Sequence, residues 1–293
     1  MGEALFISDR VTLKDLYQLT KPTITLLVVV TAIPNLYLAG MGISFNHALW
    51  ILLGIALCSG SAAVFNQIVE KDTDQLMFRT KKRAFAASRI SFKEALVFAS
   101  VLGFAGVLTL IWQANLLAAA LALGGHFFYV VVYTLYLKKR TPQNIVIGGA
   151  AGAVGPLIAQ AAVEGRVGLS ALLLALIIFV WTPPHFWSLA LLYQADYRQA
   201  KIPMYPVVYG EAKTKAAIFG YSLLLLPLII SLTLIGKAGF VYLVPAVLLT
   251  LKLIFDAFLL IKDENNQRAM PFFHYSCLYI LGVFAFLTLD AFL

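Results

Sequence analysis

Residues 168–192 read GLSALLLALIIFVWTPPHFWSLALL and contain no Asp, Glu, Lys or Arg. A helix needs about 20 mostly apolar residues to cross a hydrocarbon layer of roughly 30 Å, so this run is long enough to span a bilayer. A membrane strand would instead alternate apolar and polar residues, which this run does not do. The stretch therefore predicts a transmembrane helix.

The composition of the whole chain fits the same environment. Of its 293 residues, 61% are hydrophobic and 12% are charged, whereas a soluble domain is about 45–50% apolar and about 25% charged. An ordinary water-soluble enzyme is thereby excluded. Because helices satisfy their own backbone hydrogen bonds in lipid, and no linker or low-complexity segment interrupts the pattern, we predict an all-α, polytopic membrane protein with a single domain over residues 1–293.

Eight further apolar runs resemble the first, which makes nine predicted spans. In chain order they lie near 23–42, 47–68, 94–112, 115–137, 144–163, 168–192, 214–235, 239–261 and 271–292. An odd number of spans places the two termini on opposite sides of the membrane.

The basic residues indicate which side is which. Nineteen of the 22 Lys and Arg residues fall in the amino-terminal segment and the even-numbered connections, which share one side. Only Arg166 and Lys237 fall on the other side, and Lys252 lies inside a span. Since Lys and Arg concentrate in cytoplasmic loops, we expect a cytoplasmic amino terminus and an external carboxyl terminus. The net charge of +8 reflects this topology, and we expect no nucleic-acid partner.

The amino-terminal segment does not look like a targeting sequence. Its acids Glu3, Asp9 and Asp15 are interspersed with cations, and no cleavage site follows the first apolar run. Since signal and transit peptides lack these features, we expect a bacterial inner (plasma) membrane. Thr12 and Asp15 have capping-box spacing, which predicts a short surface helix before the first span.

An amide and two carboxylates recur at four-residue intervals at the cytoplasmic end of the second span: Asn66, Glu70 and Asp74. If the helix continues, they share one face, offset by about 40° per step. Such hard oxygen ligands suit Mg²⁺ together with phosphate oxygens. Arg79 and Arg83 follow at once and can bind phosphate. A solvated loop of mixed charge would explain these cations, but not the aligned acids.

A further carboxylate, Asp196, lies in the sixth-to-seventh connection, on the same side of the membrane. Alone it could be a charge at a helix end. Two acidic sites that face each other across a bundle could each hold a magnesium ion on a shared diphosphate.

These residues, together with several longer motifs, resemble the UbiA superfamily of intramembrane prenyltransferases. The similarity is specifically to the branch that farnesylates heme. It rests on Leu19–Pro22, Asn66–Arg83, Lys138–Gly149, Trp181–Trp187, Asp196–Pro206 and Phe273–Ser276. The chain departs from the family pattern at Ala84, Ser88, Gly155 and Lys201.

The resemblance implies a UbiA-like helical bundle that transfers the farnesyl group of farnesyl diphosphate to the 2-vinyl group of heme B, with addition of water. The products are heme O and diphosphate. It implies Mg²⁺ held by Asn66, Glu70, Asp74 and Asp196, and substrate contacts from Arg79, Arg83, Lys138 and His185. The implied partners are heme B, farnesyl diphosphate, the lipid bilayer and a downstream heme-modifying enzyme.

Alternatives remain open from the residues alone. His185 follows two prolines inside a span, where freed carbonyls need partners, so a structural role competes with a heme-facing one. Trp181 and Trp187 are more simply packing residues than porphyrin contacts, and we interpret His126 as structural.

Two other functions also remain open. The acidic motif also fits a prenyltransferase acting on a quinone precursor. A transporter would place its charges near the midplane, whereas here they gather at one surface.

Overall fold

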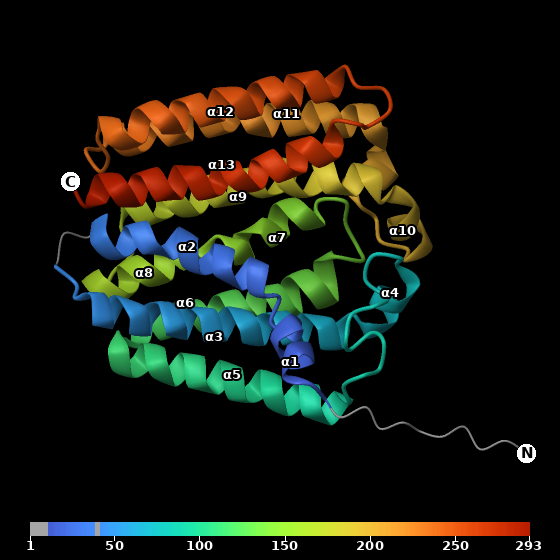
Figure 1. Cartoon of the computed structure of the whole chain (residues 1–293), viewed down its shortest axis with the longest axis horizontal. Coiled ribbons are helices and arrows are strands. Elements are labelled where there is room, and N and C mark those ends of the chain that lie inside the picture. The colour runs from blue at the N-terminus through green and yellow to red at the C-terminus, as the bar shows by residue number, and fades with distance from the viewer. Residues whose placement is uncertain (1–10, 39–41) are drawn as a thin grey trace, which may run out of the picture.

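The computed structural model describes residues 11–38 and 42–293, and within these ranges every regular element is a helix. Eight spans are long and apolar enough to cross a membrane, and a bent helix pair near the amino terminus makes a ninth. The long helices run side by side from one end of the molecule to the other (Figure 1). The predicted all-α, polytopic fold is thus confirmed, and the predicted number of nine spans is reached when the bent pair is counted as one span.

The nine spans use twelve of the fourteen helices that the described ranges contain. They are α1 with α2 (Leu13–Leu19 and Pro22–Leu38), α3 (Phe45–Val69), α5 (Phe92–Gln113), α6 with η1 (Leu116–Phe127 and Phe128–Leu137), α7 with α8 (Asn144–Gly152 and Val154–Glu164), α9 (Leu169–Leu192), α11 (Tyr205–Leu234), α12 (Phe240–Ile261) and α13 (Ala269–Ala291). The other two, α4 (Lys71–Leu76) and α10 (Gln194–Gln199), are short.

The first span is broken. Helix α1 begins after Thr12, whose hydroxyl accepts a hydrogen bond from the Asp15 backbone N–H at 3.1 Å, as the capping spacing predicts. The axis then bends by 53° between α1 and α2. The predicted end of this span, near residue 42, falls partly on residues 39–41, and the acids Glu3 and Asp9 fall on residues 1–10. Both lie outside the described ranges.

The seventh span begins at Tyr205, earlier than the predicted residue 214. Gly210 interrupts it with φ 79° and ψ 172°, a conformation that glycine adopts without steric cost. The chain therefore makes one short helical turn, bends, and only then crosses the bundle.

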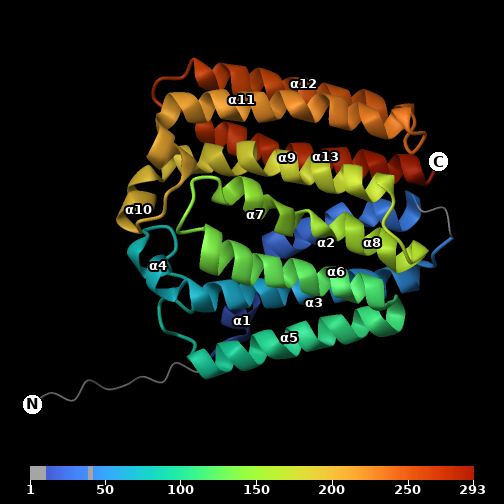
Figure 2. The ribbon, with the colours of Figure 1, turned by 180° about the vertical axis from the view of Figure 1, so that it is seen from behind.

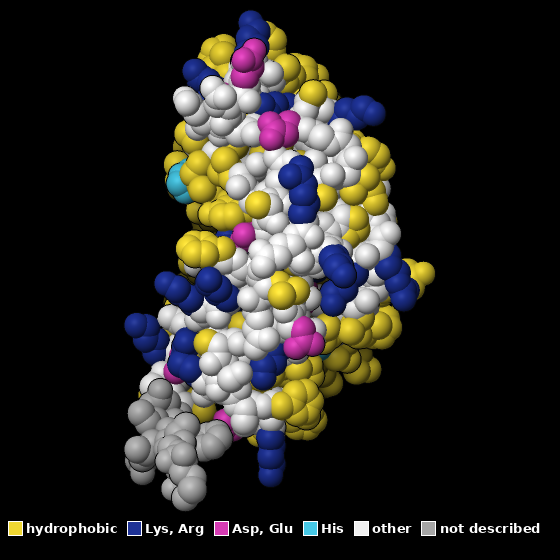
Figure 3. Space-filling model, turned by 90° about the vertical axis from the view of Figure 1, so that its right-hand side faces the viewer, with side chains coloured by type: hydrophobic (Ala, Val, Ile, Leu, Met, Phe, Trp, Pro, Cys, Tyr) yellow, Lys and Arg dark blue, Asp and Glu magenta, His cyan; other side chains and the backbone are white. Residues whose placement is uncertain are grey.

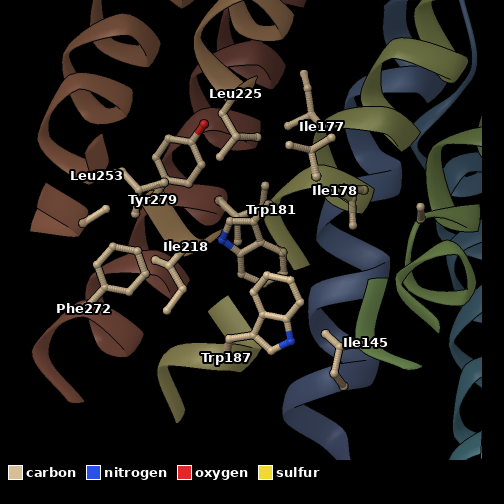
Figure 4. Close-up of a cluster of buried hydrophobic side chains, with 14 of the residues drawn as sticks. Ile145, Ile177, Ile178, Trp181, Trp187, Ile218, Leu225, Leu253, Phe272 and Tyr279 are labelled. Atoms are coloured by element: carbon tan, nitrogen blue, oxygen red, sulfur yellow. The ribbon is translucent and has the colours of Figure 1, made fainter. Parts of the chain in front are cut away.

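Helices α9, α11, α12 and α13 enclose a large apolar core. Figure 4 shows Trp181 and Trp187 among Leu225, Phe272 and Tyr279 in this core. The Trp181 indole N–H donates to the Ser276 carbonyl at 2.9 Å. Both tryptophans are buried, in agreement with a packing role.

Helices α7 and α8 approach their neighbours closely because glycines line the contacts. A Cβ at Gly148 would lie 2.3 Å from the Tyr133 ring, and one at Gly155 would lie 2.8 Å from the Val28 carbonyl oxygen. The glycines of this segment thus allow helices to pack closely, as small residues commonly do in membranes.

The two short helices, α4 and α10, lie together at one end of the bundle (Figure 2). Figure 3 views this end and shows Lys and Arg side chains spread across it. The carboxyl terminus lies at the opposite end (Figure 1). The polar connections that the sequence places on one side of a membrane are therefore on one side of the fold.

Candidate active site

The four-residue spacing of Asn66, Glu70 and Asp74 continues across a helix break. Helix α3 ends at Val69, yet the Glu70 N–H donates to the Asn66 carbonyl at 3.0 Å, and the Asp74 N–H donates to the Glu70 carbonyl at 2.7 Å. All three side chains are buried, with 1%, 4% and 4% of their surface exposed. Hard oxygen atoms are thus presented inside the charged end of the bundle.

Each of these side chains already has a cationic partner. Lys138 pairs with Glu70, Arg83 pairs with Asp74 at 2.8 Å, and the Lys21 ammonium donates to the Asn66 amide oxygen. Two carboxylates and three cations therefore form one cluster, which we call the acid–cation cluster.

Burial and ion pairing shift the pKa values of this cluster in opposite directions. Burial by itself would raise the pKa of the Glu70 carboxyl, but the nearby Lys138 and Lys21 ammonium groups outweigh it and lower that pKa below its ordinary value. Burial likewise opposes the charge on Lys138, but Glu70 raises the Lys138 pKa above its ordinary value. The pair is ionised at neutral pH.

Helix η1 supplies much of the cluster through an unusual backbone. Residues Phe128–Leu137 form a π-helix, in which residue i bonds residue i+5. Tyr129 and Thr134 therefore lie one turn apart on one face, as do Tyr133 and Lys138. Thr134 accepts from the Asn66 amide at 3.0 Å, and the Tyr129 hydroxyl lies 3.5 Å from the Lys21 ammonium.

Sequence reasoning predicted Lys138 for the site but missed Lys21, Tyr129 and Thr134. On an ordinary α-helix of 3.6 residues per turn, Lys138 would point about 180° away from Tyr129. The expectation of an ordinary helix over 115–137 therefore concealed this shared face. The only available signal for Lys21 was its position next to Pro22 at the start of a span.

Asp196 and Arg79 meet beside this cluster. Helix α10 carries Asp196, and its carboxylate accepts from the Arg79 backbone N–H at 3.3 Å. The Arg79 guanidinium lies 5.7 Å from the Tyr193 ring centre. The next residue, Thr80, donates to the Asp74 carbonyl at 2.9 Å, so the backbone of one loop links Asp196 to the acid–cation cluster. In the described ranges no three His, Cys, Asp or Glu side chains converge on a preformed metal site.

A cavity of about 250 Å³ extends from the acid–cation cluster into the bundle. At its polar end lie Lys21 and Tyr129, and its wall is otherwise mostly apolar. Helices α2, α3, α6, η1, α7, α8 and α9 all contribute to it. A polar end that carries an ammonium group, joined to an apolar interior, suits a molecule with an anionic head and a hydrocarbon tail.

His185 lies apart from this cavity. Its Nδ1 lies 2.8 Å from the Ser276 hydroxyl, and its ring stacks between Trp181 and Phe273 at centroid distances of 4.3 and 4.6 Å. From the same helix, Thr182 and Phe186 line the cavity instead. The structure therefore brings most of the predicted site residues to one end, but directs His185 toward α13.

Comparison with known proteins agrees with this geometry. The UbiA prenyltransferase family matches residues 26–281. The chain belongs to the UbiA prenyltransferase family.

Among relatives of this UbiA family member, "Protoheme IX farnesyltransferase" of Gloeobacter violaceus is 46% identical over 281 residues, covering 95% of this chain and 92% of the relative. The protein of the same name from Marinobacter nauticus is 43% identical over 280 residues, covering 95% and 93%.

Solved structures share the fold of this UbiA family member at low sequence identity. A digeranylgeranylglyceryl phosphate synthase superimposes with a TM-score of 0.77 at 18% identity, covering 95% of this chain and 98% of that one. A UbiA homologue from Archaeoglobus fulgidus bound to DMAPP and Mg²⁺ gives 0.67 at 15% identity, covering 93% and 99%. At these identities the likeness shows the fold alone.

Proposed function

We propose that the chain, acting as one membrane domain over residues 1–293, transfers the farnesyl group of farnesyl diphosphate to the 2-vinyl group of heme B, with addition of water, to give heme O and diphosphate. The observation that carries the proposal is the apolar cavity that opens from the acid–cation cluster. The names of the relatives at 43–46% identity support heme B as the acceptor.

The acid–cation cluster suits the loss of diphosphate. Lys138, Arg83 and Arg79 would bind diphosphate oxygens or heme propionates, because cations that donate hydrogen bonds to phosphate are strong partners. Lys21 and Tyr129 line the polar end of the cavity, where they would orient the head group. The apolar wall would hold the farnesyl chain and keep water from the allylic cation.

The donor atoms also fit magnesium. Asn66, Glu70, Asp74 and Asp196 offer amide and carboxylate oxygens, the ligands that Mg²⁺ takes alongside phosphate. When bound, the ion would neutralise charge on the leaving diphosphate. Glu70 and Asp74 would then exchange their present partners for the metal. A UbiA homologue of the same fold is described as bound to Mg²⁺, which supports the use of this ion.

The acceptor can be tested directly. Membranes from cells that express the chain should gain heme O at the expense of heme B, measured by chromatography and mass spectrometry of extracted porphyrins. Farnesylation of a quinone precursor without any heme O would assign the other acceptor. We expect heme O to pass to a downstream heme-modifying enzyme.

Arg83→Ala and His185→Ala should affect different substrates. Arg83 pairs with Asp74 in the cluster, so its loss should weaken farnesyl diphosphate binding by about 1.5–3 kcal/mol, roughly tenfold to a hundredfold. His185 lies within α9 and stacks between Trp181 and Phe273. We propose that the porphyrin of heme B binds beside this stack, so loss of His185 should weaken heme binding and leave diphosphate affinity unchanged. Separate binding measurements on purified variants test both. Wild-type heme binding and turnover in His185→Ala would leave His185 with a structural role between Trp181 and Phe273.

The site should face the cytoplasm of a bacterial inner membrane. Because Lys and Arg concentrate at the end of the bundle that carries α4 and α10, a reporter fused after Arg83 should read as cytoplasmic. A reporter fused after Leu293 should read as external. The opposite pair of readings would invert the proposed orientation.

A further inference from the structure

Tyr197 brings a buried hydroxyl without a partner to the charged end of the bundle. It belongs to α10, which lies beside α4 (Figure 2), and it directly follows Asp196 in the chain. Only 1% of its surface is exposed, and its hydroxyl forms no hydrogen bond with any group in the described ranges. Because a buried polar group without a partner costs free energy, such a group needs an explanation.

The backbone holds this phenol in place. The Tyr197 N–H donates to the Tyr193 carbonyl at 3.1 Å, and the Tyr197 carbonyl accepts from the Ile202 N–H at 2.9 Å. The second bond closes a turn that includes Lys201, whose φ of 54° lies in the left-handed region. The position of the ring is therefore set by the fold around it, and not by a contact of its hydroxyl.

The cations around this hydroxyl can donate hydrogen bonds but cannot accept them. The Arg79 guanidinium, the Lys138 ammonium and the Glu70 carboxylate lie close enough to the Tyr197 phenol to interact electrostatically with it. Glu70 is already paired with Lys138. Arg79, in contrast, forms no ion pair with a carboxylate in the part of the chain that the structure describes.

This group of side chains suits a ligand that only accepts hydrogen bonds. A tyrosine hydroxyl carries its proton at neutral pH, because its ordinary pKa is about 10. The Tyr197 hydroxyl and the Arg79 guanidinium are thus two donors without an acceptor, beside the Lys138 ammonium. The oxygen atoms of a diphosphate are acceptors that carry negative charge, and charge strengthens such bonds.

We propose that Tyr197 is a catalytic residue whose hydroxyl donates a hydrogen bond to the departing diphosphate; this inference rests on the proposed function. In that reaction the bond between C1 of the farnesyl group and its diphosphate oxygen breaks, and the electron pair stays on the oxygen. The diphosphate gains one negative charge, so a donor already in place binds it more tightly in the transition state than in the substrate. The hydroxyl keeps its proton throughout.

Tyr197→Phe removes this hydroxyl and keeps the ring. Because the hydroxyl has no partner within the fold, we expect the Tm of the variant without ligand to be unchanged or higher. The affinity for inorganic diphosphate with Mg²⁺ and the kcat for heme O formation should each fall roughly tenfold to a hundredfold, the usual loss for a hydrogen bond to a charged group. Thermal unfolding, calorimetric titration and chromatography of porphyrins measure the three quantities on purified protein.

Tyr242→Phe is the matched control. Tyr242 is also buried, but its hydroxyl donates to the Ile229 carbonyl at 3.1 Å, and it lies near the start of α12, outside the acid–cation cluster. Its loss should lower the Tm and leave diphosphate affinity and kcat unchanged. The two variants thus separate a hydroxyl that stabilises the fold from one that serves the ligand.

The outcomes of this comparison are distinct. Wild-type diphosphate affinity or wild-type kcat in Tyr197→Phe would overturn the proposal. So would a Tm as low as that of Tyr242→Phe, or failure of Tyr197→Phe to fold, because the hydroxyl would then stabilise the fold itself. Absence of both diphosphate binding and prenyl transfer in the wild type would instead refute the proposed function.

Discussion

Asp74→Asn should lower farnesyl transfer roughly 10²–10³-fold while leaving the fold intact, since removing charge stabilisation worth about 3–4 kcal/mol from the transition state has that effect. Asp74 is buried and pairs with Arg83, and the neutral amide keeps its shape but loses its charge. Rates of heme O formation measure the loss, and circular dichroism checks the fold. Chelation should abolish wild-type turnover, and added Mg²⁺ should restore it.

Asp72→Asn provides the control for charge alone. Asp72 belongs to the same short helix, two residues earlier, but its side chain is exposed. We expect near wild-type activity from it. Full activity of Asp74→Asn in excess chelator would show that the acids of this motif do not bind a catalytic metal.

Gly152→Phe should block the farnesyl chain. Gly152 is exposed and lines the central cavity, and a Cβ at this position would meet no atom within 4 Å, so there is room for a larger side chain at the cavity wall. Displacing about four chain carbons costs about 3 kcal/mol, at ~0.8 kcal/mol for each buried CH₂, or roughly a hundredfold in kcat/KM. Turnover with farnesyl diphosphate should show this loss.

The matched variant Gly152→Ala should retain activity, because its methyl group fits without contact. The shorter donor dimethylallyl diphosphate should bind both variants about equally. If Gly152→Phe used farnesyl diphosphate as well as Gly152→Ala does, the farnesyl chain would not occupy this part of the cavity.

Local sequence patterns were sufficient to predict most of the fold. Uncharged runs of helix length indicate spans directly, because lipid leaves few alternatives to a helix. They fail at 205–213, where Glu211 and Lys213 lower the hydropathy although the helix has already begun. Glu211 is satisfied there by Gln194 and Asn266, which donate to it at 2.7 Å from other segments. Such distant partners cannot be read from one segment.

In the candidate site, too, the local sequence predicts some residues, whereas others depend on how the helices pack. The spacing of Asn66, Glu70 and Asp74 is local, so the sequence by itself indicates their shared face. The approach of Lys21, in contrast, depends on how α2 packs against α3, and the direction of His185 depends on which flank of α9 meets α13. Helical periodicity gives the angle between two side chains of one helix, but not the neighbour that each one meets.

The pairing within the acid–cation cluster has a thermodynamic consequence. Metal binding to Glu70 and Asp74 would release Lys138 and Arg83, and Lys138 would then be a largely buried charge without a partner. Diphosphate oxygens can accept these released cations. We therefore expect metal and diphosphate to bind with positive coupling, each raising the affinity for the other by the same factor. The site would then bind either ligand alone only weakly. The ion pairs of the cluster would be exchanged for metal and diphosphate contacts only when both ligands are present.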